Sequence, residues 1–397
     1  MRTRRGLAPL ACLLTLALVA VACTSRGSST STNSSSVPAA AAGGPLRLKG
    51  VCPDPIVFQT DWNPESEHGF LYNLVGPGFT VDTAKKRVTG PLVASGKDTG
   101  VKIQVRMGGP SIGFQPVPAV MYLDRSITLG YVATEEAVQY SIKQPTTAVM
   151  AQLEISPLAI MWSPDLHPNF HTIADIGQTT TKVLYTNGLT YMEYLVGAGI
   201  LRRAQLNGSY NGAPDLFVGS GGKAALQGFA TSEPYLYEHE IKQWGKPLAY
   251  QLVNDTGYPS YFAAVSVRSG DKQQLAPCLR KLVPILQQSQ VDFAKNPQPA
   301  INLILQLVDQ YKTGWVYSRG LAEFSARQMV QKGIVANGVV GNHSDTTLGN
   351  FDMARVKRTM DIVTPIFAAE KKPVRPGLRP EDIATNEFID PQIGLPS

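Results

Sequence analysis

Strand and helix signals alternate along most of this chain, and that alternation constrains its fold more than any other feature of the sequence. Residues 101–106 alternate apolar with polar side chains, which is typical of a half-buried strand, and the run is followed by Gly108-Gly109-Pro110. Residues 127–132 then indicate a strand, and residues 135–140 a helix capped by Thr134. Because strands that alternate with helices pair through right-handed crossovers, this pattern predicts an α/β fold with parallel sheets.

The same pattern begins again after two apolar segments, residues 148–153 and 157–162. A strand is expected at 182–185, followed by a helix at 191–198 that a Thr190–Glu193 capping box opens. Beyond residue 270 helical spacing predominates. The other expected elements are short segments at 56–59, 216–219 and 229–231, strands at 249–253 and 262–267, and helices at 68–75, 117–123, near 223–227, 274–294, 299–311 and 319–332. Two α/β lobes followed by a helical end is the layout that these elements predict.

The N-terminus has the features of an export signal. Arg2, Arg4 and Arg5 precede about sixteen mostly apolar residues, and small residues stand directly before Cys23. The stretch Leu18–Cys23 resembles a bacterial lipobox, whose cysteine is diacylated and becomes the mature N-terminus. The resemblance therefore implies lipidation of Cys23 and a place on the extracytoplasmic face of the cell membrane. The alternative is an ordinary secretory cleavage with an incidental cysteine.

Charge and cysteine content exclude some classes of function. Removal of the signal takes three arginines with it, so the formal charge falls from +6 to +3, and the basic residues are scattered. We therefore expect no nucleic-acid partner. Cys52 and Cys278 remain in a compartment that permits disulfides, and we expect them to pair; the alternative is two buried free thiols. Two cysteines so far apart do not suggest a zinc site, and we expect no metal and no cofactor.

Composition divides the chain into a tether, a globular part and a tail. The segment that follows the signal consists mostly of Ser, Thr, Gly and Ala, which cannot bury enough surface to fold. Roughly 320 residues of globular composition follow, which is more than one hydrophobic core usually holds. We expect a signal peptide at 1–22, a disordered tether at 23–44, lobe 1 at 45–157 and 262–366, lobe 2 at 158–261, and a surface or disordered tail at 367–397.

Two segments resemble a known family. Trp62, Pro64 and His68 match in order the spacing of a motif in the thiamine-pyrimidine-precursor group of solute-binding proteins. Residues 228–235 resemble the second-lobe signature of the wider nitrate-, sulfonate- and taurine-type binding proteins, and residues 156–161 resemble the segment where those proteins cross between lobes. The chain departs from the family at Phe79 to Thr99, which is longer than the usual connection there.

The resemblance implies a two-lobed periplasmic-binding-protein fold of type II, with a hinge of two crossovers near residues 156–161 and 259–264. It also implies a monomeric lipoprotein, carrying a palmitate-type anchor, that captures a small molecule and delivers it to an ABC permease in the membrane. In open α/β sheets ligands bind beyond the carboxyl ends of strands, and this rule selects the loops that hold the candidate residues. The candidate ligand-binding residues are Asp61, Trp62, His68, Tyr185, Asn187, Ser232, Glu233 and Tyr235.

These side chains indicate what the ligand is. An anion site would need arginine, lysine or free amides, whereas carboxylates and aromatic rings favour a flat ring with amino groups, uncharged or cationic, such as an aminopyrimidine. Each residue also has a structural interpretation. The alternative for Trp62 is packing in the core, that for His68 is packing at the start of a helix, and that for Glu233 is an ion pair at the hinge. Tyr185 and Asn187 could serve only as turn residues.

Other functions agree less well with the sequence. Eukaryotic relatives of the family make the pyrimidine precursor with iron and a cysteine cluster, which this chain lacks, so we expect no enzyme. The sequence contains no HExxH motif of the kind that binds zinc on a helix. His167 and His171 could hold a metal, but Pro168 between them disfavours the helix that would align their rings. A sensor that signals to a membrane receptor remains an alternative to transport.

Overall fold

The computed structural model describes residues 37–340 and 343–396. The predicted signal peptide, Cys23 and the first part of the predicted tether therefore lie outside the described residues. The rest of that tether, residues 37–44, is not disordered as predicted. Ala39 forms a parallel bridge with Asp98, and the amide of Ala40 donates to the carbonyl of Asp98 at 2.8 Å. This segment is ordered because it satisfies backbone groups of strand β4 (Lys97–Arg106).

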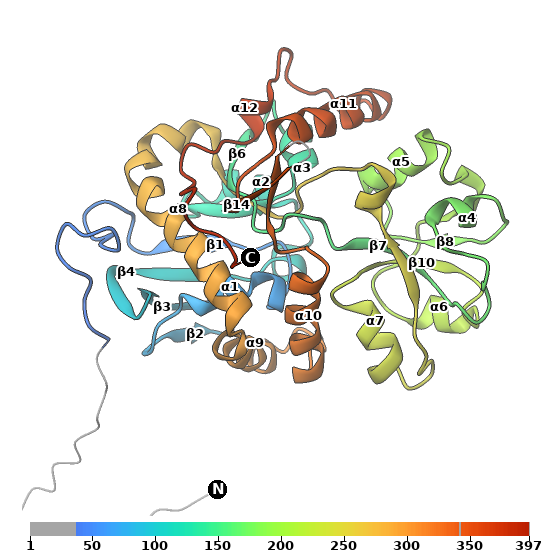
Figure 1. The fold of residues 1–397 in the computed structure, drawn as a ribbon, viewed down its shortest axis with the longest axis horizontal. Coiled ribbons are helices and arrows are strands. Elements are labelled where there is room, and N and C mark those ends of the chain that lie inside the picture. The colour runs from blue at the N-terminus through green and yellow to red at the C-terminus, as the bar shows by residue number, and fades with distance from the viewer. Residues whose placement is uncertain (1–36, 341–342, 397) are drawn as a thin grey trace, which may run out of the picture. The chain divides into compact units, whose positions relative to one another are not determined.

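The first sheet has seven strands in the order β2-β3-β4-β1-β5-β12-β6 (Figure 1). Strand β1 runs parallel to β4 and to β5, whereas β12 is antiparallel to both of its neighbours. The sheet is therefore mixed, not wholly parallel as predicted, because β12 returns from the second sheet in the opposite direction. The other strands are β1 (Ile56–Gln59), β2 (Thr80–Asp82), β3 (Arg87–Ala94), β5 (Leu129–Val132), β6 (Thr146–Met150) and β12 (Ala264–Arg268).

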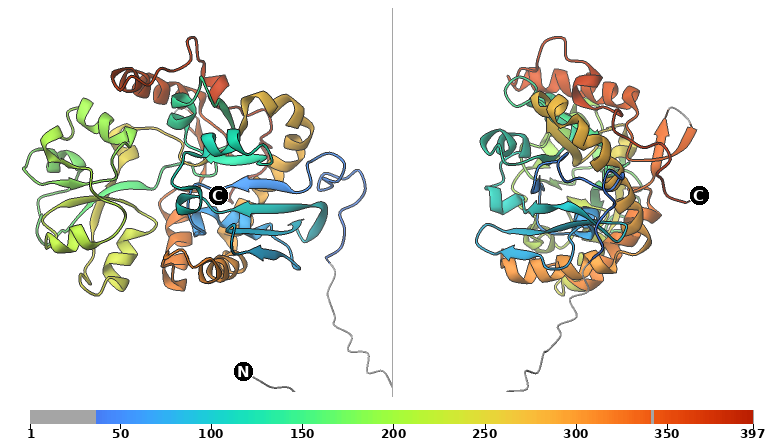
Figure 2. Two further views of the ribbon diagram at one scale, coloured as in Figure 1. Left: turned by 180° about the vertical axis from the view of Figure 1, so that it is seen from behind. Right: turned by 90° about the vertical axis from the view of Figure 1, so that its left-hand side faces the viewer.

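The segment from Phe79 to Thr99 has a clear structural role. It contains β2 and β3, which pair antiparallel with each other, and β3 pairs antiparallel with β4. Along β3 buried and partly exposed residues alternate strictly, as in a strand with one face on the core. The segment therefore widens the first sheet at one edge (Figure 2).

The second sheet has five strands in the order β11-β7-β10-β8-β9. Strands β8, β9 and β10 are parallel, and β7 is antiparallel to β10 and β11. The helix predicted near residues 223–227 is wrong, since residues 225–227 belong to strand β10; so short an apolar run does not distinguish helix from strand. The strands are β7 (Leu158–Trp162), β8 (Val183–Leu184), β9 (Leu206–Asn207), β10 (Ala225–Phe229) and β11 (Ala249–Leu252).

Helices follow most strands, and long helices form the C-terminal part, as Figures 1 and 2 show. None of the helices in the described part of the chain combines the length and apolarity needed to span a membrane. The helices are α1 (Gly69–Asn73), α2 (Val117–Leu123), α3 (Thr134–Gln139), α4 (Ile173–Gly177), α5 (Thr190–Gly197), α6 (Asp215–Gly219), α7 (Glu233–Tyr235), α8 (Lys272–Lys295), α9 (Gln298–Tyr311), α10 (Arg319–Gln331), α11 (Met353–Ala369) and α12 (Pro380–Ile383). A 3-10 turn, η1 (Ser66–His68), leads into α1, and the π-helical η4 (Leu236–Glu240) continues α7. A separate hairpin pairs β13 (Asn337–Val340) with β14 (His343–Leu348).

Two predicted helix caps are wrong. Thr134 does not cap α3; its hydroxyl accepts a hydrogen bond from the amide of Tyr261 at 3.0 Å, in the connection that leads back to β12. Thr190 lies inside α5, and the Glu193 carboxylate bonds Arg203 instead of closing a capping box. In both cases a contact distant in sequence competes successfully with the local cap.

Two chain connections join the sheets, residues 151–157 from β6 to β7 and residues 253–263 from β11 to β12. Arg355, near the start of α11, binds both. Its guanidinium donates to the carbonyl of Glu154 at 2.7 Å and of Pro259 at 2.7 Å, and it forms a buried ion pair with the Glu154 carboxylate. One side chain thus ties the two connections to a single helix.

The segment before β1 and the C-terminal tail are both attached to the part of the fold that holds the first sheet. Cys52 and Cys278 are joined, which links the segment before β1 to α8. The tail is ordered up to residue 396, so the disordered alternative is wrong: Ala384 bridges Ala148 of β6, and Phe388 is buried in the core. Apolar side chains in the tail give it surface to bury, which its proline and charge content obscured.

Candidate functional site

The loops that follow β1 and β4 lie side by side. The amide of Gly108 donates to the carbonyl of Trp62 at 3.0 Å, and that of Gly109 to the carbonyl of Asp61 at 2.9 Å. A Cβ at Gly108 would lie 2.2 Å from the carbonyl oxygen of Thr60, so only glycine permits this approach. These contacts hold Asp61 and Trp62 at the carboxyl end of β1.

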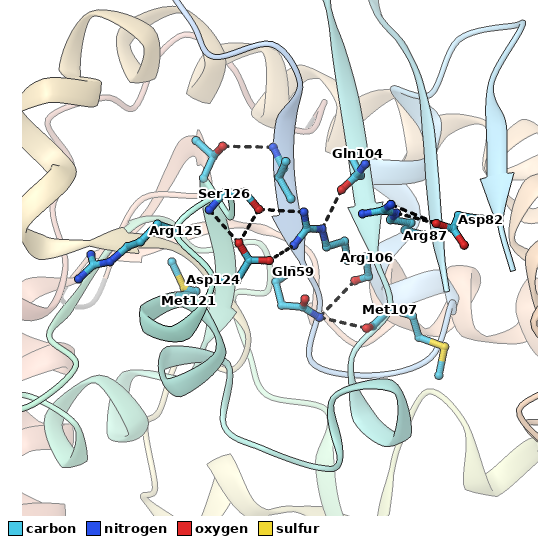
Figure 3. A network of polar contacts seen from close by, with 12 residues as sticks. Gln59, Asp82, Arg87, Gln104, Arg106, Met107, Met121, Asp124, Arg125 and Ser126 are labelled. Atoms are coloured by element: carbon cyan, nitrogen blue, oxygen red, sulfur yellow. Dashed lines mark hydrogen bonds and ion pairs between the residues drawn. The ribbon is translucent and has the colours of Figure 1, made fainter. Parts of the chain in front are cut away.

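A polar network supports this edge of the sheet (Figure 3). The side-chain amide of Gln59 donates to the carbonyl of Met107 at 3.0 Å, and Arg106 bonds Gln104, Asp124 and Ser126. Hydrogen bonds from Ser126, together with Arg106, hold the pKa of Asp124 at about 2. The charge of Arg106 is therefore neutralised within the network and is not directed at a ligand.

His68 and Asp61, both predicted site residues, are in direct contact. His68 Nε2 lies 3.0 Å from Asp61 Oδ1 and 3.7 Å from Glu65 Oε1, and the imidazole is almost completely buried. Burial, together with the charges of Glu67, Asp61 and Glu233, raises the pKa of Glu65 well above its usual value. The ring of Tyr131, on β5, lies with its centroid 5.0 Å from that of His68.

Glu67 connects the two sheets at this point. Its carboxylate accepts hydrogen bonds from Thr231, in the loop after β10, and from Ser325 of α10 at 3.3 Å. Glu233, two residues after Thr231, accepts a hydrogen bond from the amide of Phe229 at 2.6 Å. Burial raises the pKa of Glu233 to about 7, and the charge of Glu67 contributes to the shift. Acidic side chains from both sheets therefore face one another.

The N-terminus of α3 adds two more carboxyl groups. Glu136 accepts a hydrogen bond from the amide of Ala133 at 3.2 Å, and Glu135 accepts one from Ser260. Burial, with the neighbouring charge of Glu135, raises the pKa of Glu136 to about 8. A helix N-terminus ordinarily attracts anions, but here the helix's own glutamate occupies the free amide.

Aromatic rings line the neighbouring surface. The Trp62 ring centroid lies 5.9 Å from that of Phe114 and 6.1 Å from that of Trp315, and Trp315 stacks on Tyr317 at 6.0 Å. Phe114 is 68% exposed, so this group reaches the protein surface. The arrangement offers ring faces on which a flat molecule can stack.

The other predicted residues make local contacts. The Tyr185 hydroxyl donates to the side chain of Asn187 at 3.4 Å, and the hydrogen bonds and ion pairs of the described residues do not connect this pair to Asp61 or Glu67. Ser232 precedes α7 without a side-chain cap bond, and Tyr235 packs against Phe324 of α10 with a centroid distance of 5.3 Å. In the described part of the chain no group of three His, Cys, Asp or Glu side chains could hold a metal ion. His167 instead stacks on Phe170.

Several residues of the site were missed by sequence reasoning. Glu65 and Glu67 lie between Trp62 and His68, inside the motif itself, and could have been included on that ground. Tyr131, Glu135, Glu136 and Trp315 had no local signal, because only the strand order and the loop between α9 and α10 bring them here.

A cavity of about 540 Å³ lies elsewhere, between α8, the turn joining β3 to β4, and residues 45–46. None of the predicted ligand-binding residues lines it. Its basic side chains are already engaged, since Arg280 pairs with Glu387 and Lys281 donates to the carbonyl of Gly44. This cavity is therefore a weaker candidate than the acidic region between the sheets.

Comparisons with known proteins give information about the fold only. No sequence-family model and no curated protein matches the chain. Among solved structures, a protein from Bordetella bronchiseptica RB50 is 13% identical, covering 85% of this chain and 96% of its own, with a TM-score of 0.50. The periplasmic aliphatic sulphonate binding protein SsuA from Escherichia coli is 11% identical, and the match covers 83% of this chain and 94% of SsuA, with a TM-score of 0.49. An ABC transporter protein from Parabacteroides distasonis is 14% identical, and the match covers 85% of this chain and 99% of that protein, with a TM-score of 0.45.

Identities this low show a fold and not an activity. The two sheets, each flanked by helices and joined by two connections, agree with that likeness. The chain therefore shares its α/β fold, with two sheets flanked by helices and joined by two connections, with the protein from Bordetella bronchiseptica RB50.

Proposed function

We propose that this chain is the extracytoplasmic, lipid-anchored substrate-binding protein of an ABC importer. The observation that carries the proposal is the meeting of Glu67, from the first sheet, with Thr231 and Glu233, from the second. A site built from both lobes closes when its ligand bridges them, which is how a hinged receptor couples binding to a change of shape. Lobe 1 would comprise residues 45–157 and 262–366, and lobe 2 residues 158–261.

The proposed ligand is a small flat heterocycle that carries amino groups, with an aminopyrimidine as the best match. Trp62 and Trp315 offer faces for stacking, and Asp61 and Glu67 offer oxygens that accept from amino groups. A receptor is favoured over a pyrimidine-precursor enzyme, whose chemistry goes with iron and a cysteine cluster. Cys52 and Cys278 are joined to each other.

Ligand release tests the proposed receptor function. The mature protein would be purified without refolding and denatured, and the small molecules that it releases would be identified by mass spectrometry. We expect a nitrogen heterocycle in a stoichiometry near one. The recovery of no small molecule, together with no thermal stabilisation by pyrimidines, flavins, polyamines or sulfonates, would contradict the receptor function.

Membrane attachment is tested separately through Cys23. Cells expressing the full chain and fed radiolabelled palmitate are expected to label the wild-type protein and not the Cys23→Ser variant. Labelling of both would show that the lipid is attached elsewhere. Recovery of a permease with the wild-type protein, after detergent extraction, would support the proposed transport partner.

A further inference from the structure

Six acidic side chains face one another between the two sheets. The charges of Glu67, Asp61 and Glu233 all act on Glu65, and those of Glu135 and Asp61 act on Glu136. His68 is the one basic group of the described residues that lies within 4.0 Å of any of them, since the described ion pairs include no lysine or arginine partner for these acids. The six are Asp61, Glu65, Glu67, Glu135, Glu136 and Glu233, called the acidic cluster below.

Two buried polar atoms beside the acidic cluster point independently to a ligand. His68 Nδ1 and the Tyr131 hydroxyl have no hydrogen-bond partner among the described residues, although the two side chains are only 2% and 1% exposed. The charge of Asp61 acts on the Tyr131 hydroxyl, which places that hydroxyl near the carboxylate. Buried polar groups are almost always paired, so two unpaired ones at one place indicate atoms that a bound molecule contacts.

The ring faces of Trp62 and Trp315, beside this cluster, favour positive charge as well. The face of an aromatic ring is electron-rich and attracts cations, an indole more than a phenyl ring. An anion would have to approach carboxylates that pair with no lysine or arginine among the described residues, at a cost that rises as water is excluded. The charge distribution therefore selects among the ligands that the proposed function allows.

We propose that the ligand is an organic cation, a flat ring bearing a protonated amino or amidino group that lies within the acidic cluster. This inference rests on the proposed receptor function and narrows its ligand class. The cation also competes with protons for the cluster. Burial raises the pKa of Glu65 well above its usual value and the pKa of Glu233 to about 7. A positive charge bound beside these two carboxyl groups favours their ionised forms, so it lowers both pKa values and protons are released on binding.

The pH dependence follows from the groups that face these two carboxyls. Because nearly all of them are acidic or phenolic, raising the pH makes the cluster more negative and strengthens cation binding. The groups that face Glu65 are Asp61, Glu67, Glu233, His68, Tyr72, Tyr131 and Tyr317, and those that face Glu233 are Glu65, Glu67, Tyr210 and Tyr237.

The test uses matched probes and calorimetry on the mature chain. One set is benzylamine, benzyl alcohol and benzenesulfonate, and a second is 4-aminopyridine, 4-pyridone and pyridine-4-sulfonate. We expect each cation to bind about tenfold or more tightly than its neutral partner, and the sulfonates not to bind. Cation affinity should rise about tenfold from pH 6 to pH 8, with proton release measured in buffers of different ionisation enthalpy.

Variants assign the effect to the acidic cluster. Glu67→Gln should lower the affinity for the cationic probes about tenfold and leave the affinity for the neutral probes within about twofold of wild type. The control Glu238→Gln, at an exposed carboxylate, should change neither affinity. Should Glu67→Gln fail to fold, Glu233→Gln replaces it, because a glutamine can still accept from Phe229.

The outcomes separate this inference from the receptor function. Tighter binding of a neutral or sulfonate probe, or a cation affinity that falls as pH rises, overturns the cation inference and leaves a receptor. Binding of no probe also overturns it. The receptor function fails only if, in addition, the purified protein releases no small molecule.

Discussion

Arg355 is the single side chain whose removal should most disturb the connections between the sheets. Its guanidinium donates to the carbonyls of Glu154 and Pro259 at 2.7 Å each and of Ser260 at 3.3 Å, and it lies 3.8 Å above the ring of Tyr261. It also pairs with the Glu154 carboxylate at 3.0 Å, and both side chains are less than 10% exposed. We predict that Arg355→Met destabilises the protein strongly.

The expected magnitude follows from this burial. Removing one partner of a buried ion pair costs about 3–5 kcal/mol, because the remaining charge loses its partner in a medium that solvates it poorly. Arg355→Lys keeps the charge but not the planar fork that reaches both connections, so we expect a loss of about 2 kcal/mol. Lys357→Met, which removes an exposed ion pair with Asp361 on the same helix, should cost less than about 0.5 kcal/mol.

Urea unfolding, followed by circular dichroism and by tryptophan fluorescence, measures these free energies. A double-mutant cycle between Arg355→Met and Glu154→Gln should return a coupling of at least about 1 kcal/mol. A loss below about 1 kcal/mol for Arg355→Met, at unchanged denaturant slope, would show that the guanidinium does not hold the two connections together. A loss for Lys357→Met as large as that for Arg355→Met would refute the reasoning from burial.

Three further predictions test other parts of the fold and site. Because burial raises the pKa of Glu136 from 4.5 to about 8, the folded state binds more protons than the unfolded state between those values, and stability falls as pH rises through that window. Glu136→Gln should therefore be more stable than wild type at pH 9, by about 5 kcal/mol in the free energy of unfolding, and equally stable at pH 4; equal stability at pH 9 would contradict the raised pKa. Reduction of the Cys52–Cys278 disulfide, which closes a loop of sequence separation 226, should lower the free energy of unfolding by about 3–5 kcal/mol in urea titrations with and without reductant, and an unchanged midpoint would show that the link does not restrict the unfolded chain. Trp62→Ala should lower the affinity for the ligand recovered from the protein about tenfold, whereas Trp62→Phe should lower it only a few fold, as measured by calorimetry. Equal losses of affinity in the two variants would argue against stacking on the Trp62 ring.

Local patterns predicted much of the secondary structure. The strand over residues 101–106 and the helix over residues 117–123 were recognised because apolar periodicity depends on neighbours in sequence. The prediction failed near residues 223–227, where the short apolar run forms strand β10. There the partner strands β7 and β8, distant in sequence, decide the conformation.

The candidate site divides in the same way. Asp61, Trp62 and His68 could be named from one motif, since they lie within eight residues of each other. Glu135 and Glu136 could not, because they reach the site only through the placement of β5 beside β1 in the sheet. The contact between Glu67 and Thr231 joins residues 164 apart in the chain.

The amino-acid sequence by itself determined the α/β class, the two cysteines able to pair, and an aromatic and acidic motif around Trp62. These are properties of composition and of short-range spacing. The tertiary structure alone decided the mixed order of the first sheet, the joining of both connections by Arg355, and the gathering of six carboxyl groups beside His68, their one basic neighbour among the described residues. Burial and electrostatic interaction depend on distance in space, which strand order and chain crossovers set and local sequence does not.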